Sequence, residues 1–251
     1  MPLNYKIVSI EGNIGSGKST LLENLRNHYK DNKNVIFLRE PVEEWDKITD
    51  NEGTTMLKKF YADQEKYSFA FQMMAYISRL KILRDTVKDI NDEKRILLQD
   101  RVDQLINKKQ ENIDKCTFPE YVIITERSLY TDKHVFAKML YDQGKIESVC
   151  YQIYLKWFEE FTSDFHINYS VYVNAKPQNC YERIHIRSRV GEELIPLSYL
   201  QNCHNYHEDF LANNTNKLVL DGNINIYEDK NIVNYWIDQI NNFILPIDQN
   251  K

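Results

Sequence analysis

A glycine-rich motif near the start of the chain limits the possible folds more than any other feature. It matches G-x-x-x-x-G-K-[S/T] and consists of Gly12, Asn13, Ile14, Gly15, Ser16, Gly17, Lys18, Ser19 and Thr20. An apolar, β-type run precedes it and the helical pattern LLENLRNHY follows, which is the context that a phosphate-binding loop needs. Such a loop points backbone N–H groups and the positive end of a helix at an anion. The motif predicts ATP binding, with Lys18 at the β- and γ-phosphates and the Ser19 hydroxyl on Mg²⁺.

Five short apolar runs rich in β-branched residues predict the strands of a parallel sheet. They are Tyr5–Ile10, Asn34–Leu38, Tyr121–Thr125, Tyr169–Val173 and Lys217–Leu220. Their continuous apolarity suits strands buried on both faces, and helical periodicity follows each run. In the long gap between the second and third runs, apolar residues recur every three or four positions and predict a long helix from Tyr61 to Asp89. We therefore expect an α/β doubly wound fold and, without repeats or linkers, one domain over residues 1–251.

The composition excludes several classes of protein. The 32 Lys and Arg residues against 37 Asp and Glu give a net charge of −5, which disfavours a broad nucleic-acid-binding face. The longest stretch free of acidic, basic and His side chains has 12 residues, whereas a membrane-spanning helix needs about 20. No basic and apolar targeting pattern opens the chain, so we expect a cytoplasmic protein without a presequence. Cys116, Cys150, Cys180 and Cys203 are too widely spaced to predict disulfides or a zinc site.

Charged residues follow two of the predicted strands, at the sheet edge where ligands of parallel sheets bind. Glu40 follows the second strand and is suited to accept a proton from a substrate hydroxyl, although a charge at a helix start explains it equally well. Trp45 is explained by core packing as well as by a ligand. Glu126 and Arg127 follow the buried third strand, where unpaired charges are costly, so we expect them to function in the site.

Three of the ten arginines, Arg183, Arg187 and Arg189, fall within seven residues at the end of a predicted helix. Compensation of the helix dipole is one explanation of their position. Guanidinium groups also match phosphate oxygens and neutralise the charge that spreads during phosphoryl transfer. A GTPase switch is disfavoured, because the D-x-x-G match at Asp50–Gly53 follows no strand and no [N/T]-K-x-D motif is present.

Five motifs in this order resemble the deoxyribonucleoside kinases of the deoxycytidine, deoxyguanosine and insect multisubstrate type. They are EGNIGSGKST, REPVEEW, YSFAFQMMAYISR, ERSLYTD and RIHIRSRVGEELIPL, and they extend from Ile7 to about Leu200. The resemblance implies a P-loop kinase with a five-stranded parallel sheet flanked by helices. It also implies a helical lid at about residues 183–193, ATP and Mg²⁺ as cofactors, a deoxyribonucleoside as substrate, and a homodimer.

The resemblance further implies a role for each matching residue. Lys18, Glu40 and Arg127 are expected to carry catalysis: Glu40 takes the proton of the nucleoside 5′-hydroxyl, and Arg127 contacts the 5′-oxygen and the donor phosphates. Glu126 joins Ser19 as a ligand of Mg²⁺. The residues expected to contact the nucleoside, besides Glu40 and Arg127, are Trp45, Tyr61, Phe71, Gln72, Arg79, Asp132 and Glu192. Phe71 stacks on the base, Gln72 reads its edge, Arg79 and Asp132 orient Gln72, and Tyr61 with Glu192 holds the sugar 3′-hydroxyl.

These roles predict an ATP-dependent kinase for the 5′-hydroxyl of deoxyribonucleosides. The Arg79 and Asp132 pair resembles members that take deoxycytidine and purine deoxynucleosides rather than thymidine. One alternative is a nucleoside monophosphate kinase such as a thymidylate kinase, which would need basic groups where REPVEEW is acidic. Another is a catalytically silent nucleotide-binding module, which has no use for a base at the acceptor side. The loop at Asp221–Asn225 is expected to lie beside the adenine of ATP.

Overall fold

A five-stranded parallel sheet forms the centre of the molecule. The computed structural model describes residues 5–108, 119–189, 191–226 and 230–244. The strands are β1 (Tyr5–Glu11), β2 (Val35–Leu38), β3 (Tyr121–Glu126), β4 (Tyr169–Asn174) and β5 (Lys217–Asp221). Their order is β2-β3-β1-β4-β5, and every neighbouring pair is parallel. The five predicted strands and the α/β class are confirmed, with each strand end within one residue of its prediction.

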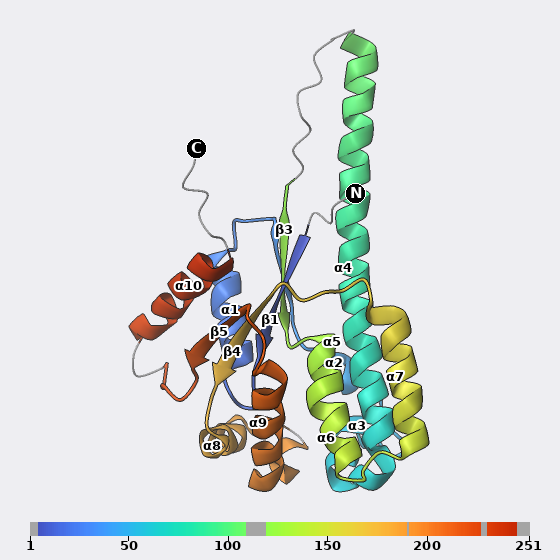
Figure 1. Ribbon diagram of the computed structural model, residues 1–251, viewed down its shortest axis with the longest axis vertical. Coiled ribbons are helices and arrows are strands. Elements are labelled where there is room, and N and C mark those ends of the chain that lie inside the picture. Colours follow the sequence, from blue (N-terminus) through green and yellow to red (C-terminus); the bar gives the residue numbers. More distant parts are fainter. Residues whose placement is uncertain (1–4, 109–118, 190, 227–229, 245–251) are drawn as a thin grey trace.

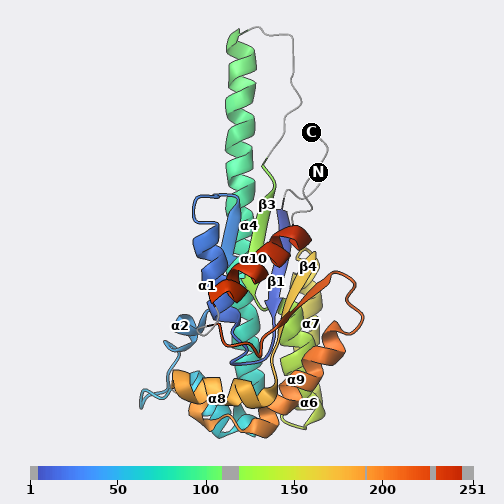
Figure 2. The same ribbon diagram turned by 90° about the vertical axis from the view of Figure 1, so that its left-hand side faces the viewer.

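Helices cover both faces of the sheet and its lower edge. They are α1 (Lys18–His28), α2 (Val42–Trp45), α3 (Met56–Ala62), α4 (Gln64–Lys108), α5 (Leu129–Thr131), α6 (Lys138–Asp142), α7 (Ser148–Thr162), α8 (Pro177–Arg187), α9 (Leu197–Leu211) and α10 (Lys230–Ile244). A π-helical turn, η1 (Asp132–Ala137), joins α5 to α6, and a 3₁₀ turn, η2 (Glu192–Leu194), precedes α9. Figures 1 and 2 show α1 and α10 on one face, α4 and α7 on the other, and α8 and α9 beneath the carboxyl ends of the strands.

The core follows from the alternation of side chains along each strand. In β1, Val8 and Ile10 pack toward α1 and α10, whereas Ile7 packs toward α4 and α7. All three side chains are fully buried, and burial of each contributes about 1.5–3 kcal/mol to stability. A third apolar cluster, among α3, α4, α6 and α9, lies below the carboxyl ends of the strands. The sheet edge that carries the predicted site is therefore supported from beneath.

The helix predicted from Tyr61 to Asp89 is wrong at both ends. Tyr61 lies on α3, and Asp63 separates that helix from α4. The Asp63 carboxylate accepts a hydrogen bond from Lys66 N at 3.1 Å and so caps the first turn of α4. At its other end α4 continues beyond Asp89 because residues 90–108 contain neither glycine nor proline. Figure 1 shows this helix projecting well past the sheet.

Two further expectations concern membranes and cysteines. None of the helices in the described part of the chain is both long and apolar enough to cross a membrane. Cys150, Cys180 and Cys203 are free thiols, and Cys116 lies outside the described residues.

Candidate active site

A cleft of about 810 Å³ opens at the carboxyl ends of the strands, between the phosphate loop, α3, α4 and α8. This volume suits a small-molecule site. Every residue that the sequence places at the site lines the cleft, apart from Gly12 and Asn13. The lining cations are Lys18, Arg79, Arg127, Arg183, Arg187 and Arg189, and the lining carboxylates are Glu40, Glu126, Asp132, Glu182 and Glu192. The cleft thus gathers six of the chain's basic side chains against five carboxylates, although the net charge of the chain is −5, and such cations favour a polyphosphate ligand.

The phosphate loop is fixed by contacts with the helices beneath it. Asn13 Nδ2 donates to the carbonyl of Leu200 in α9 at 2.8 Å, so this side chain anchors the loop rather than facing the cleft. Gly15 has φ +77°, and a Cβ there would lie 2.5 Å from the carbonyl oxygen of Cys180. A side chain at this position would force apart the loop and α8, so the glycine allows the two to touch.

Lys18 is almost fully buried, and its Nζ donates to the carbonyl of Asn13 at 2.6 Å. Burial and then the charge of Arg127 lower the pKa of Lys18 to about 7, against the opposing charges of Glu126 and Glu40. A polyphosphate beside Lys18 would favour its protonated form. Nucleotide binding and protonation of Lys18 are therefore linked.

Ser19 and Glu126 together offer oxygen ligands beside the phosphate loop. Ser19 Oγ donates to Glu126 Oε1 at 2.5 Å. Mg²⁺ prefers such hard oxygen ligands and takes few of them from protein, completing its shell with water and phosphate. Within the described ranges, no group of three or more His, Cys, Asp or Glu side chains is placed to hold a metal ion. The donor set fits Mg²⁺ that arrives with a nucleotide.

Four charged side chains form a buried network on the acceptor side of the cleft. Arg127 Nη1 and Arg79 Nη2 donate to Glu40 Oε1 at 2.5 Å and 3.1 Å. Arg79 Nε also donates to Asp132 Oδ2 at 2.9 Å. Burial alone would raise the pKa of Glu40, but the charges of Arg127, Arg79 and Lys18 outweigh it and lower that pKa. Glu40 is therefore a carboxylate at every physiological pH.

Aromatic side chains wall the same end of the cleft. Phe71 stacks on Phe60 with ring centroids 4.4 Å apart, and the ring of Trp45 meets Phe71 edge-on at 5.6 Å. Next to Phe71, Gln72 is 2% exposed, and its Oε1 has no hydrogen-bond partner in the described part of the chain. Arg79 bonds Asp132 and Glu40, but neither Arg79 nor Asp132 bonds the Gln72 Oε1, so their expected role in orienting Gln72 stays a prediction. A buried amide oxygen that faces a cleft without a partner is suited to accept from a ligand.

Sequence reasoning missed Phe136, which also lines the cleft. The guanidinium carbon of Arg127 lies 5.1 Å from the centre of its ring. Phe136 and Asp132 share the π-helical turn η1, a conformation that is frequent at functional sites. The available signal was the spacing of four residues from Asp132, which brings two side chains to one side of a helix.

The predicted lid comprises the end of α8, a turn and η2, so only part of it is helical. Arg187 Nη2 and Arg189 Nη1 donate to the two carboxylate oxygens of Glu192, at 2.5 Å and 3.1 Å. Arg183 instead donates to the carbonyl of Gly222 at 2.7 Å and joins α8 to the loop expected at adenine. Val190 lies outside the described residues.

Comparison with known proteins agrees with this geometry. The family model "Deoxynucleoside kinase" matches residues 8–245. The probable deoxycytidine kinase of fowlpox virus is 30% identical over 249 residues, which cover 96% of this chain and 88% of that one. Deoxycytidine kinase 2 of Gallus gallus is 31% identical over 264 residues, 94% of this chain and 89% of that one. Mitochondrial deoxyguanosine kinase of Xenopus laevis is 29% identical over 238 residues, 89% of this chain and 80% of that one. Since the match extends from β1 to the last helix of the described chain, the chain belongs to the deoxynucleoside kinase family of phosphotransferases.

Proposed function

We propose that this kinase transfers the γ-phosphate of ATP to the 5′-hydroxyl of deoxyribonucleosides, and that it favours deoxycytidine and purine deoxynucleosides over thymidine. The observation that carries the proposal is the buried Glu40–Arg127 ion pair, 2.5 Å long, in the same cleft as Lys18 of the phosphate loop. It sets a proton acceptor beside the site of a phosphate donor. Relatives named as deoxycytidine and deoxyguanosine kinases support this substrate class.

On the donor side, positively charged groups neutralise the transferred phosphoryl group. Lys18 binds the β- and γ-phosphates, and Arg187 and Arg189 reach them from the lid. Mg²⁺ held by Ser19 and Glu126 would supply further neutralisation of the phosphate oxygens. Arg183 acts through its carbonyl contacts, which hold the loop after β5 against α8.

On the acceptor side, Glu40 accepts a hydrogen bond from the 5′-hydroxyl and turns its oxygen toward the γ-phosphate. Because its pKa is low, Glu40 is a weak base, and the proton reaches it late, as the new O–P bond forms. This order suits the loose transition state of phosphoryl transfer. When the 5′-hydroxyl binds to Glu40, Arg127 loses part of its contact with Glu40 and contacts the 5′-oxygen that attacks the γ-phosphate.

The base is held between Phe71 and Phe136 and read by Gln72. The unpartnered Oε1 of Gln72 suits the exocyclic amino group of cytosine or adenine, and the amide also offers a donor for guanine. The guanidinium of Arg79 suits the N7 acceptor of a purine, which neither pyrimidine carries, so the preference for deoxycytidine over thymidine rests on the amino group of cytosine. Tyr61 and Glu192 both line the cleft, and a sugar hydroxyl is expected between them.

The test is transfer of labelled γ-phosphate from MgATP to deoxycytidine, deoxyadenosine, deoxyguanosine, thymidine and thymidylate by one preparation. A higher kcat/KM for thymidine than for the other three nucleosides would overturn the base preference. Product from thymidylate alone would make the protein a nucleoside monophosphate kinase, and no product at all would favour a silent module.

The role of Glu40 is tested by Glu40→Gln, which keeps the shape of the side chain but removes the proton acceptor. We expect kcat to fall by about 10²–10⁴-fold. The matched control is Glu43→Gln, an exposed carboxylate on the neighbouring α2, which should leave kcat unchanged. Near-normal turnover of Glu40→Gln would contradict the assignment.

We also propose that the chain forms one kinase domain, with its lid at about residues 183–193, and that two chains form a homodimer through α4 and α7. These helices expose large apolar side chains at Ile77, Val149, Ile153 and Trp157. Such a concentration is typical of a protein interface. The cytoplasmic location expected from the sequence stays a prediction, and one of the relatives is named as mitochondrial.

A further inference from the structure

One buried carboxylate holds two arginines of the lid at once. The Glu192 side chain is 6% exposed, whereas those of Arg187 and Arg189 are 35% and 34% exposed. Both carboxylate oxygens are used, one by each guanidinium. Glu192 is thus the fixed partner, and the two arginines are the parts that can turn toward solvent or toward the cleft.

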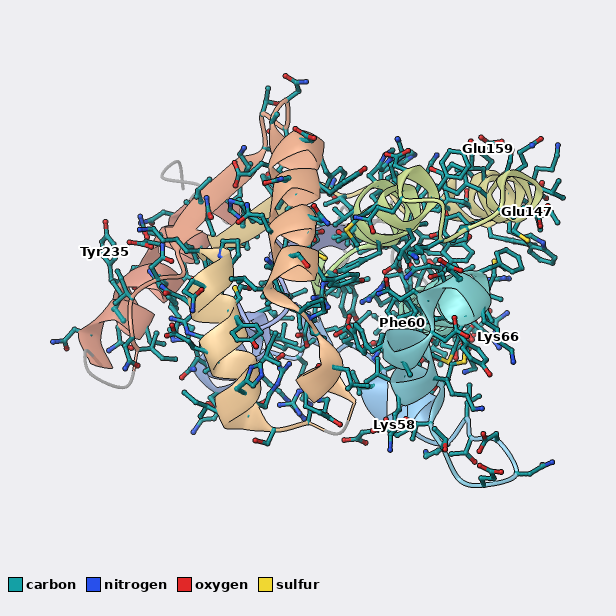
Figure 3. The ribbon with its side chains drawn as sticks, turned by 90° about the horizontal axis from the view of Figure 1, so that it is seen from below. Lys58, Phe60, Lys66, Glu147, Glu159 and Tyr235 are labelled. Atoms are coloured by element: carbon teal, nitrogen blue, oxygen red, sulfur yellow. The ribbon has the colours of Figure 1, made fainter. Side chains whose placement is uncertain are left out.

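The segment that carries Glu192 is packed against α3, the helix that carries Tyr61. Gly191, just before Glu192, has φ +91°, and a Cβ there would lie 3.2 Å from the Cα of Lys58 in α3. Figure 3 shows Lys58 on the side of α3 nearest the segment that joins α8 to α9. Burial and then the charge of Glu192 raise the pKa of Tyr61, so the phenol stays protonated beside the carboxylate. Tyr61 and Glu192 both line the cleft.

A phenol and a carboxylate that line the same part of a cleft can bind a hydroxyl group together. A hydroxyl donates one hydrogen bond and accepts others, so it can donate to Glu192 and accept from Tyr61. An ionised carboxylate has about four lone-pair sites, which leaves Glu192 able to accept from this hydroxyl while it keeps both arginines. The acceptor sugar and the lid arginines would therefore bind to the same two carboxylate oxygens of Glu192.

We propose that Glu192 is a positioning residue through which the 3′-hydroxyl of the acceptor sugar sets Arg187 and Arg189 for the phosphates of ATP. A hydroxyl bound to Tyr61 and Glu192 fixes the carboxylate, and the carboxylate then holds both guanidinium groups in the cleft. Without the hydroxyl, the arginines spend more time turned outward. The inference rests on the proposed function, since it needs a nucleoside sugar in the cleft.

The test measures the affinity of the Mg²⁺ complex of β,γ-imido-ATP, alone and with saturating deoxycytidine or 2′,3′-dideoxycytidine. Deoxycytidine should tighten binding of the analogue by about fivefold or more, and the analogue should tighten binding of deoxycytidine by the same factor. Dideoxycytidine should leave the affinity of the analogue within about twofold of its value alone, far below the usual range of coupling between sites. Equal tightening by the two nucleosides would overturn the inference.

Glu192→Gln should abolish the difference between the two nucleosides, and Glu193→Gln, an exposed neighbour in η2, should preserve it. A loss of structure alone would weaken binding of both nucleosides but would not make their effects on the affinity of the analogue equal. The melting temperature of each variant shows whether it is folded. Full coupling in folded Glu192→Gln would overturn the inference. A preparation that phosphorylates deoxycytidine but shows no coupling refutes the inference alone, whereas one that phosphorylates no nucleoside refutes the proposed function and the inference with it.

Discussion

At the scale of single residues, the site is governed by how buried charges are paired. Lys18 donates to a backbone carbonyl and forms no ion pair within the described part of the chain, whereas Glu40 is shared between two arginines. The pKa of Lys18 is lowered because burial disfavours its charge, and the pKa of Glu40 is lowered because the nearby cations stabilise its charge. Both groups depend on the partners that a ligand brings or displaces.

The pKa of Lys18, about 7 without nucleotide, predicts that nucleotide binding takes up a proton. At pH 8 about nine-tenths of Lys18 is neutral before binding, and the phosphates restore its charge. We expect uptake of about 0.9 proton at pH 8 and about 0.1 at pH 6. Titration calorimetry with β,γ-imido-ATP in buffers of different ionisation enthalpy measures this number. Equal uptake at the two pH values would contradict the prediction, and Lys18→Arg, which stays charged, should remove it.

His207 predicts a loss of stability in acid. It is fully buried, its Nδ1 lies 2.7 Å from the Cys203 carbonyl, and burial lowers its pKa to about 3. Unfolding raises this pKa to about 6.5, so the unfolded chain binds more protons between these values and stability falls as pH falls. From pH 7.5 to pH 5 the wild type should lose about 2 kcal/mol more than His207→Leu, measured by urea unfolding. The exposed His166→Gln is the control and should follow the wild type; parallel losses in all three proteins would refute the prediction.

At the scale of elements, the strands were predictable and the boundaries around α4 were not. A strand buried on both faces must be apolar throughout, so its sequence stands out. The start of α4 depends on a single cap at Asp63, which splits one periodic pattern into two helices. The contact of Arg79 with Glu40 was also beyond prediction, since it joins α4 to the loop after β2 and depends on how the two pack. The positions of Glu40 and Glu126 at the sheet edge followed from topology alone.

A buried hydrogen bond ties the end of β1 to the turn after β3. Glu11 is fully buried, and its Oε2 accepts from Thr131 Oγ1 at 2.5 Å. The turn begins at Arg127, whose φ of +60° is unusual for a residue with a side chain. Thr131 also bonds Ser128 through its backbone N–H at 3.1 Å. The Glu11–Thr131 bond thus fixes the turn that aims Arg127 into the cleft.

Thr131→Val should therefore lower both stability and turnover. It keeps the shape of the side chain but leaves the Glu11 carboxylate without a donor, at a cost of about 1.5–3 kcal/mol in the free energy of unfolding. We expect kcat to fall while KM for MgATP changes little, because the phosphate loop is untouched. Thr86→Val, which removes a hydroxyl bonded within α4, should stay within about 0.5 kcal/mol of the wild type. Urea unfolding and steady-state kinetics measure the two effects, and a Thr131→Val enzyme with unchanged kcat would contradict the role given to this turn.

At the scale of the whole molecule, the distribution of surface features favours a symmetric dimer. Tyr76 of α4 donates its hydroxyl to the carbonyl of Trp157 in α7, so the two helices pack as a unit. On α4, Lys81 is paired with Asp85 at 2.5 Å, so Arg84 is the exposed cation beside that pair, and the last turns of α7 carry the exposed Glu159 and Glu160. A two-fold axis would set α4 of one copy against α7 of the other, pairing these opposite charges around the apolar side chains. The cleft lies at the carboxyl ends of the strands and is lined by none of these exposed apolar side chains, so we expect dimerisation to leave it accessible.

The dimer is tested with Trp157→Glu, which places a charge among the exposed apolar residues. Burying that carboxylate in an apolar interface is costly, so we expect sedimentation velocity to show a species of twice the 30.0 kDa chain mass for the wild type and of the chain mass for the variant. The control is Tyr235→Glu, which changes an aromatic on α10 that is 58% exposed, against 46% for Trp157. Figure 3 shows Tyr235 on the opposite side of the molecule from Glu159, so this change should leave the dimer intact. A monomeric wild type would refute the dimer, and a dimeric Trp157→Glu would place the interface away from α7. Since each cleft is complete within one chain, the monomeric variant should keep phosphate transfer to deoxycytidine.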